Sequence, residues 1–183
     1  KNVNINPTRM GIIKILIQMN ANIKIINKKN NNGEFVGDIK IKNTKNFKSI
    51  NCPETLNSAA IDEFLLIFLV AAKSKGISSF KNLSELNKKE SPRLNIAINF
   101  LKMIVVTVVR KKDDIKIFGN PKLHLTGNYH VKKFLKDHRV FMMSVIAALT
   151  LGGQSWKIEN KDSINTSFPD FLQILKKLGA KIN

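Results

Sequence analysis

Segments with apolar residues at helical spacing alternate with short β-like runs along this chain. Spacings of three and four residues predict helices over Pro7–Asn20, Asp62–Lys75, Pro92–Met103, Arg139–Leu151 and Phe168–Leu178. β-branched or alternating residues predict strands over Asn22–Ile26, Val36–Lys42, Ser78–Asn82, Val105–Arg110, Asp114–Phe118, Val131–Leu135 and Ser155–Asn160. The polar, Asn-rich segment from Lys28 to Gly33 predicts a hairpin turn between the first two strands. Together these elements predict an α+β fold with an α/β-like order.

A weak internal repeat joins helix ends to the strands that follow them. The similar segments are Ile15–Ile23, Phe100–Val106 and Ile174–Ile182. Asn20 and Gly179 stand where a left-handed residue closes a helix, and both residue types tolerate that conformation. Ile104 breaks this rule, because a β-branched residue is costly there, so its helix should end differently or carry strain. Units about 80 residues apart predict repeated helix–strand modules around one core.

Composition favours one domain and argues against several kinds of site. With 183 residues, 43% of them hydrophobic, the chain can form one domain that buries about 70% of its unfolded surface. The longest apolar run, Phe64 to Ala72, is too short to cross a bilayer. It therefore predicts a buried helix rather than a membrane segment, and no membrane is expected as a partner. The single cysteine, Cys52, excludes an internal disulfide and a Cys-based zinc site. Nothing in the sequence indicates a metal or an organic cofactor.

Charge says less about function than the positions of the arginines. The net charge is +18, but Lys, Asn and Ile dominate throughout, which indicates a general compositional bias. Only four of the 31 basic residues are arginine, and Arg9, Arg93 and Arg139 each open a predicted helix. The planar guanidinium holds a carboxylate or phosphate by two hydrogen bonds, and a helix start adds free N–H groups and a positive dipole end. These starts predict an anion-binding face.

Capping residues explain part of each helix start. Ser91 is expected to cap its helix with Pro92 at the first helical position, and Asp137 to cap the next, with Arg139 projecting from its first turn. Asp62 can be read in the same way, as an aspartate that caps an apolar helix. Capping alone accounts for each motif separately, but three such sites together favour a functional face.

The motifs taken together are similar to those of a known family. They are Asn6-Pro7-Thr8-Arg9-x-Gly11, Gly37-Asp38-Ile39, Ile61-Asp62-Glu63, Lys89-Glu90-Ser91-x-Arg93, Asp137-His138-Arg139 and Thr166-Ser167-Phe168-Pro169-Asp170-Phe171. This set resembles the C-terminal part of the bacterial 5-enolpyruvylshikimate-3-phosphate (EPSP) synthases. The resemblance implies repeated βαβαββ units with mixed sheets, and helices whose N-termini face a cleft between two domains. Residues 1–183 would form most of one domain, with the other upstream.

The implied reaction moves the carboxyvinyl group of phosphoenolpyruvate to the 5-hydroxyl of shikimate 3-phosphate and releases phosphate. By resemblance, Asp62 binds the acceptor hydroxyl and accepts its proton, while Lys89 and Glu85 lie at the shikimate 3-phosphate. A monomeric, cytoplasmic enzyme of the shikimate pathway is expected, with these two small molecules as partners and no cofactor. The 183-residue chain alone is expected to be inactive, because half of the cleft would be absent.

On the phosphoenolpyruvate side, Glu90 resembles the group that moves a proton at the methylene carbon. A carboxylate in that role must change protonation state, so a pKa near neutrality would help it. Arg93 and Arg139 resemble the phosphoenolpyruvate clamps. His138 and Thr166 are expected to be supporting residues.

Four positions depart from the family pattern. The family usually has Asp at Pro92, commonly Gly at Ile104, and in many members a phosphoenolpyruvate-contacting Lys at Thr166. An asparagine near the acceptor is replaced by Glu85. None of these differences removes a proposed catalytic residue.

Two alternatives remain open from the sequence. The sister enolpyruvyl transferases that act on UDP-N-acetylglucosamine share the fold, but they typically carry Asp-Leu-Arg where this chain has Asp137-His138-Arg139. A basic nucleic-acid-binding module is suggested by the charge. Against it stand a single Trp, a single Tyr and lysines that are spread rather than clustered.

Overall fold

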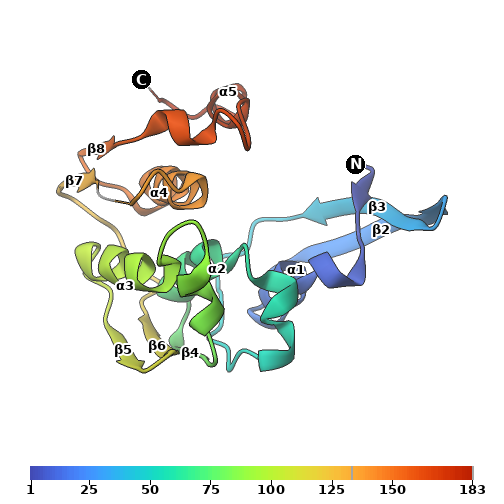
Figure 1. The fold of residues 1–183 in the computed structure, drawn as a ribbon, viewed down its shortest axis with the longest axis horizontal. Coiled ribbons are helices and arrows are strands. Elements are labelled where there is room, and N and C mark those ends of the chain that lie inside the picture. The colour runs from blue at the N-terminus through green and yellow to red at the C-terminus, as the bar shows by residue number, and fades with distance from the viewer. Residues whose placement is uncertain (133, 183) are drawn as a thin grey trace.

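Three small β-sheets surround a group of helices in the computed structural model, which describes residues 1–132 and 134–182 (Figure 1). The antiparallel sheets have the orders β1-β3-β2 and β4-β6-β5, and β7 pairs with β8 in parallel. The strands are β1 (Val3–Asn4), β2 (Ile23–Asn31), β3 (Glu34–Ile41), β4 (Gly76–Phe80), β5 (Val108–Lys111), β6 (Asp114–Gly119), β7 (Asn128–Val131) and β8 (Ser155–Ile158). The β2–β3 hairpin extends away from the helices, as Figure 1 shows.

Among the described residues, five α-helices and five short 3-10 helices accompany these strands. The helices are α1 (Gly11–Gln18), α2 (Phe64–Ala72), α3 (Arg93–Met103), α4 (His138–Leu151) and α5 (Phe171–Lys177). The 3-10 turns are η1 (Pro7–Arg9), η2 (Glu54–Leu56), η3 (Ser58–Ala60), η4 (Ser84–Lys88) and η5 (Lys161–Ile164). No helix among the described residues is both long enough and apolar enough to span a membrane.

Helix α2 forms the centre of the core because it has no polar side. All nine of its residues are apolar and seven are buried. A helix that is apolar all round must be covered on every side, and α1, α3, α4 and β6 pack against it. The rings of Phe64, Phe68 and Phe80 lie with centroids between 5.1 and 6.1 Å apart. This packing fixes the start of α2, where Asp62 and Glu63 stand.

Residues 48–119 form one complete βαβαββ unit. Segment 48–51 runs parallel to β4 through the bridges Lys48–Lys75 and Asn51–Ser79, and α2 connects the two. Helix α3 then leads into the β5–β6 hairpin, and β6 pairs with β4. On either side the order recurs in part, since β2–β3 follow α1 and α4 connects β7 with β8. The predicted fold class and its repeated unit are confirmed.

Three helices end in the same left-handed turn, and in the middle one Val105 rather than Ile104 takes the left-handed position. Asn20, Val105 and Gly179 have φ angles of 72°, 60° and 96°. Each is followed by a residue whose N–H donates to a carbonyl five residues back, in the pairs Ala21–Leu16, Val106–Leu101 and Ala180–Leu175. The prediction for Ile104 was therefore wrong by one residue, because Ile104 has φ −91°. The expected strain falls on Val105.

One predicted strand was largely wrong. Of the segment Val131–Leu135, only Val131 lies in a strand, and Lys133 lies outside the described residues. Phe134 is buried, and Leu135 has a left-handed φ of 55°. The chain leaves the sheet after Val131 to enter α4, so the buried Phe134 packs in a connection rather than in a strand, while Leu135 is exposed.

The predicted helix over Pro7–Asn20 is divided, and the predicted hairpin turn is shorter than expected. The first three residues form η1, and α1 begins only at Gly11. In the hairpin, β2 continues to Asn31, so the turn consists of Asn32 and Gly33, with φ angles of 51° and 89°. Positive φ at both central residues is the geometry that suits a two-residue hairpin.

Candidate anion-binding site

The starts of four helices meet around the carboxylate of Asp62. Arg9 ends η1 just before α1, Asp62 lies two residues before α2, Arg93 opens α3, and Arg139 is the second residue of α4. Arg9 Nη1 lies 3.8 Å from Asp62 Oδ2, Arg93 Nη1 lies 3.4 Å from Oδ1, and Arg139 Nη2 lies 3.4 Å from Oδ2. We call these three arginines the arginine cluster. The helix starts singled out in the sequence are therefore neighbours in space.

Arg93 is the buried member of the cluster, with only 1% of its surface exposed. Its Nε donates to Asp137 Oδ2 at 2.8 Å, its Nη1 donates to Asp62 at 3.4 Å, and its Nη2 pairs with Glu90. A cation this deeply buried requires counter-charges, because desolvation without pairing is costly. The guanidinium holds protein carboxylates here with the same groups that would hold an anionic ligand.

Gly11 allows Arg9 to approach the cluster. A Cβ atom at this position would lie 2.4 Å from the carbonyl carbon of Ala59, in η3. Only glycine permits such close backbone contact between the start of α1 and the turn. Since η3 leads directly to Asp62, this contact brings Arg9 to the carboxylate.

Asp62 and Glu63 do not cap α2, so the capping interpretation of Asp62 was wrong. The helix begins at Phe64, and its N-cap residue, Glu63, makes no side-chain capping hydrogen bond. Arg139 instead contacts both acids: its Nη1 donates to the Asp62 carbonyl oxygen at 3.0 Å and lies 3.6 Å from Glu63 Oε1. Burial raises the pKa of Glu63, although the charge of Arg139 opposes this.

Asp137 connects α3 to α4 from inside the protein. Its Oδ1 accepts a hydrogen bond from the Arg139 backbone N–H at 2.9 Å, as expected of the cap of α4. Its Oδ2 accepts from Arg93 Nε at 2.8 Å and from the Ser91 hydroxyl at 2.7 Å. Burial works against ionisation of this carboxyl, but the hydrogen bonds from Arg93 and Ser91 hold its pKa below the ordinary value.

The predicted cap of α3 was wrong. Pro92 is the N-cap residue, and the Ser91 hydroxyl points to Asp137 instead. Sequence reasoning identified Asp137 as a cap but missed its contact with Arg93. A chemical argument could have indicated this contact. An aspartate between an apolar run and an arginine-bearing helix needs a second hydrogen-bond partner if it is buried.

The remaining predicted site residues differ in burial, and of these only Glu90 contacts the arginine cluster among the described residues. Glu90 reaches it through Arg93, and His138 is partly buried at the start of α4. Lys89 and Thr166 are exposed, and within the described part of the chain neither makes a side-chain hydrogen bond or ion pair. Glu85 is exposed and pairs with Lys88 at 2.9 Å, a hydrogen bond that lowers the pKa of Glu85.

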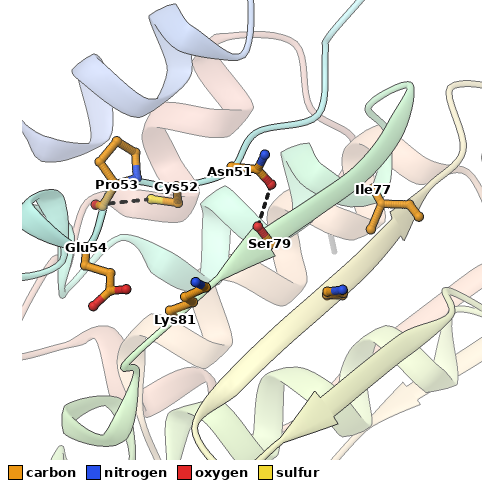
Figure 2. Close-up of a pocket in the computed structure, with 8 residues that line it drawn as sticks. Asn51, Cys52, Pro53, Glu54, Ile77, Ser79 and Lys81 are labelled. Carbon is orange, nitrogen blue, oxygen red and sulfur yellow. Dashed lines mark hydrogen bonds between the residues drawn. The ribbon is translucent and has the colours of Figure 1, made fainter.

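A separate hollow of about 690 Å³ lies beside β4 and contains none of the cluster residues (Figure 2). Asn51, Cys52 and Ser79 are among its lining residues, and Ser79 Oγ donates to Asn51 Oδ1 at 2.6 Å. Burial raises the pKa of Cys52 to about 11, so its thiol stays protonated and unreactive near neutral pH. The size of this hollow therefore does not mark it as the chemical site.

The arginine cluster places groups that can bind an anion beside groups that can exchange protons. Three guanidinium groups and four helix starts meet in one region, where the guanidinium groups pair with Asp62, Glu63, Glu90 and Asp137. Beside them, the side chains of Asp62 and Glu90 are 23% and 57% exposed, so a ligand can reach both carboxylates. This arrangement suits a substrate with several negative charges that gains or loses a proton while bound.

Comparison with known proteins identifies the family. The sequence model of the family described as EPSP synthase (3-phosphoshikimate 1-carboxyvinyltransferase) matches residues 1–175. The chain belongs to the EPSP synthase family. Relatives named 3-phosphoshikimate 1-carboxyvinyltransferase include proteins of Petrotoga mobilis, 36% identical over 97% of this chain, and Magnetococcus marinus, 35% identical over 100% of it. This chain spans 40% of the length of each of these EPSP synthase relatives.

A solved structure agrees with this assignment. The EPSP synthase of Acinetobacter baumannii superposes with a TM-score of 0.85 at 32% sequence identity, covering 99% of this chain and 41% of that one. The enolpyruvyl transferase fold expected from the sequence is therefore confirmed.

Proposed function

We propose that the protein containing this chain transfers the carboxyvinyl group of phosphoenolpyruvate to the 5-hydroxyl of shikimate 3-phosphate. Membership of the EPSP synthase family supports this reaction. The observation that carries the proposal is the meeting of Arg9, Arg93 and Arg139 at the Asp62 carboxylate. Both substrates carry phosphate, and phosphoenolpyruvate also carries a carboxylate, so paired guanidinium groups suit them. The proposed chemistry uses protein side chains alone.

The proposed phosphoenolpyruvate site lies at Arg93 and Arg139. Both guanidinium groups now pair with Asp62, and Arg93 also pairs with Glu90. A bound phosphoenolpyruvate would take over part of these contacts and leave the carboxylates free to act on the substrates. Thr166 is a supporting residue in this proposal, and its exposure leaves it accessible.

On the acceptor side, we assign Asp62 to the 5-hydroxyl of shikimate 3-phosphate. Lys89 is assigned to the 3-phosphate. Its side chain is exposed next to Glu90, so a ligand at the surface of this chain can reach it. Glu85 lies on the preceding turn η4, near enough in sequence to border the same ligand. His138 supports the start of α4 and has no proton-transfer role in this proposal.

The proposed steps conserve atoms and protons. The acceptor oxygen forms a bond to C2 of phosphoenolpyruvate as its proton passes to Asp62, and Glu90 protonates the methylene carbon C3. The product of this addition is a tetrahedral adduct. Loss of a proton from C3 to Glu90 and cleavage of the bond between C2 and the phosphate oxygen then restore the carbon–carbon double bond, and the departing phosphate takes the proton held by Asp62.

We further propose that this chain supplies most of one of two domains. Its length relative to its family members supports this, because each relative is about two and a half times as long. The starts of α1 to α4 would face a cleft that the other domain covers. The expectations of a monomer and a cytoplasmic location belong to the same proposal.

The test is a chimera in which this chain replaces the matched segment of the Petrotoga mobilis relative. Phosphate release from phosphoenolpyruvate is measured with shikimate 3-phosphate and, separately, with UDP-N-acetylglucosamine as acceptor. Release only with shikimate 3-phosphate supports the proposal. Release only with the nucleotide sugar contradicts it and favours the sister transferase. No release with either acceptor contradicts carboxyvinyl transfer and makes Pro92 the first position to examine.

The nucleic-acid alternative loses support from the packing of the aromatic residues. Trp156 stacks on Tyr129 with ring centroids 4.6 Å apart, and its Nε1 donates to the Gly152 carbonyl. One face of each ring is therefore already occupied and is not available to stack on a base. Binding of the chain to random-sequence DNA or RNA with a steep salt dependence would revive this alternative.

A further inference from the structure

We propose that Asp137 is a positioning residue that sets both Arg93 and Arg139 for anion binding. This inference rests on the proposed function, in which these two arginines bind phosphoenolpyruvate. Asp137 itself touches no substrate in the proposal. It acts through the two arginines, one held by its side chain and the other held through the start of α4.

The contacts of Asp137 use both carboxylate oxygens, and its side chain is 0% exposed. Oδ2 accepts from Arg93 Nε at 2.8 Å and from Ser91 Oγ at 2.7 Å. Oδ1 accepts from the Arg139 backbone N–H at 2.9 Å and lies 3.4 Å from Arg93 Nη2. One buried carboxylate thus holds the side chain of Arg93 and the main chain of Arg139.

These contacts determine which edge of the Arg93 guanidinium faces the site. Asp137 occupies the edge formed by Nε and Nη2, which leaves Nη1 directed at Asp62. A guanidinium without this anchor could rotate, since its side chain has several rotatable bonds. Holding the fork in one orientation before the ligand arrives reduces the ordering cost of binding.

A simple capping role does not account for these contacts. The cap of α4 needs only one oxygen, Oδ1, to accept from the Arg139 N–H. The second oxygen and the negative charge are used by Arg93 and Ser91. Asparagine retains an oxygen for the cap, but it presents an NH₂ group toward the Arg93 donors and lacks the charge. The substitution Asp137→Asn therefore separates positioning from capping.

The experiment uses the chimera with the Petrotoga mobilis relative and three variants, namely Asp137→Asn, Ser91→Ala and Asp114→Asn. Asp114 is the matched control, because its Oδ1 also accepts a backbone N–H, that of Asn82 at 3.0 Å, but it has no contact with the arginine cluster. For Asp137→Asn we expect the KM for phosphoenolpyruvate to rise about tenfold or more. The KM for shikimate 3-phosphate should change less than about twofold, since no contact to that substrate is removed.

Ser91→Ala removes one neutral donor to Asp137 and keeps the charge, so its KM for phosphoenolpyruvate should rise only a few-fold. Asp114→Asn should leave both KM values unchanged. Equal losses for the two substrates, or an unchanged KM for phosphoenolpyruvate in folded Asp137→Asn, would overturn the proposal. Loss of folding by Asp137→Asn would leave the decision to Ser91→Ala, whose unchanged KM would also overturn it.

Calorimetric titration of phosphoenolpyruvate into the same proteins separates this proposal from the proposed function. If the unsubstituted chimera binds phosphoenolpyruvate but releases no phosphate, the proposed function fails. Weaker binding by Asp137→Asn would then still support positioning. If the unsubstituted chimera neither binds nor reacts, both proposals fail together.

Discussion

The Arg139 side chain holds both the main chain and the side chain of Asp62. Its Nη1 donates to the Asp62 carbonyl oxygen at 3.0 Å, and its Nη2 lies 3.4 Å from the carboxylate. The two residues are 77 positions apart in the sequence, and their contact joins the start of α4 to the start of α2. Because both helices are packed in the core, the geometry of the site depends directly on core packing.

Replacing the planar guanidinium group of Arg139 or Arg93 should impair catalysis even when the positive charge is kept. We expect Arg139→Lys or Arg93→Lys in the chimera to lose about 2–4 kcal/mol of transition-state stabilisation, because an ammonium cannot make two parallel contacts. The measurement is kcat/KM for phosphoenolpyruvate. Arg110→Lys is the matched control, since Arg110 pairs with Asn95 and Asp113 away from the cluster. Wild-type kinetics in both cluster variants would refute their assignment as clamps.

Glu90 offers a test of proton transfer. The substitution Glu90→Gln keeps the size of the side chain but cannot exchange a proton. We expect kcat to fall by about 100-fold or more, with a much smaller change in KM, since general acid–base catalysis contributes about that factor. Stopped reactions assayed for phosphate release provide both constants. If turnover is unchanged, the proton at C3 must be moved by another group, and Asp62 becomes the next candidate.

The sequence predicted the positions of the residues proposed to bind anions better than their contacts. Helix periodicity and the scarcity of arginine placed Arg93 and Arg139 in the first turn of a helix, which the structure confirms, whereas Arg9 ends η1 just before α1. Their convergence on Asp62 depends on how distant helices pack, and local spacing carries no information about that. The two wrong caps have the same cause, because the Ser91 and Asp62 side chains found distant partners in place of nearby backbone N–H groups.

The fold was predictable where a local pattern decides it. The apolar helix α2 and the strand β6 follow from side-chain periods that tertiary packing does not change, whereas the strand predicted over Val105–Arg110 begins only at Val108. The connection at Phe134 was misread as a strand because burial of the Phe134 side chain, rather than strand pairing, accounts for this apolar residue. At Ile104 the motif was identified correctly, but the left-handed residue was placed one position too early. A one-residue shift of this kind is beyond the precision of a periodicity argument.

The pKa of Glu63 predicts a pH-dependent stability difference. Burial raises this pKa, so the stability that Glu63 contributes is fully present below its unfolded value of 4.5 and is lost as pH rises through the folded value. The free energy of unfolding of Glu63→Gln, relative to that of the wild type, should therefore be higher at about pH 7 than at about pH 4. Urea unfolding at the two pH values measures the difference.

Glu85→Gln supplies a control of opposite sign for that experiment. The hydrogen bond from Lys88 lowers the pKa of Glu85, so its contribution is present above 4.5 and is lost as pH falls through the folded value. The free energy of unfolding of this variant, relative to that of the wild type, should be lower at about pH 7 than at about pH 4. If the relative free energies of unfolding of both variants changed in the same direction with pH, the raised pKa assigned to Glu63 would be contradicted.

Gly11 should not tolerate a side chain. A methyl group at this position would meet the Ala59 carbonyl carbon at 2.4 Å, so backbone must move. We expect Gly11→Ala to destabilise the chain by about 1–3 kcal/mol, and to raise the KM for phosphoenolpyruvate in the chimera as Arg9 moves away. Gly127→Ala is the control, because its nearest neighbour, the Tyr129 hydroxyl, lies 3.7 Å from the added atom. Equal free energies of unfolding for the two variants would show that the backbone of η3 can move away from α1 without loss of stability.

Val105 should gain stability from replacement by glycine. It has φ 60° and is 82% exposed, so it carries the strain of a left-handed β-branched residue without burying its side chain. Relief of that strain is worth about 1–2 kcal/mol, and the extra flexibility of glycine in the unfolded chain offsets about 0.5–1 kcal/mol. We expect Val105→Gly to raise the free energy of unfolding by up to about 1 kcal/mol in urea titrations. Val109→Gly should lower it, because Val109 is half-exposed within β5, where glycine weakens a strand. A loss of stability in both variants would mean that contacts of the Val105 side chain outweigh its backbone strain.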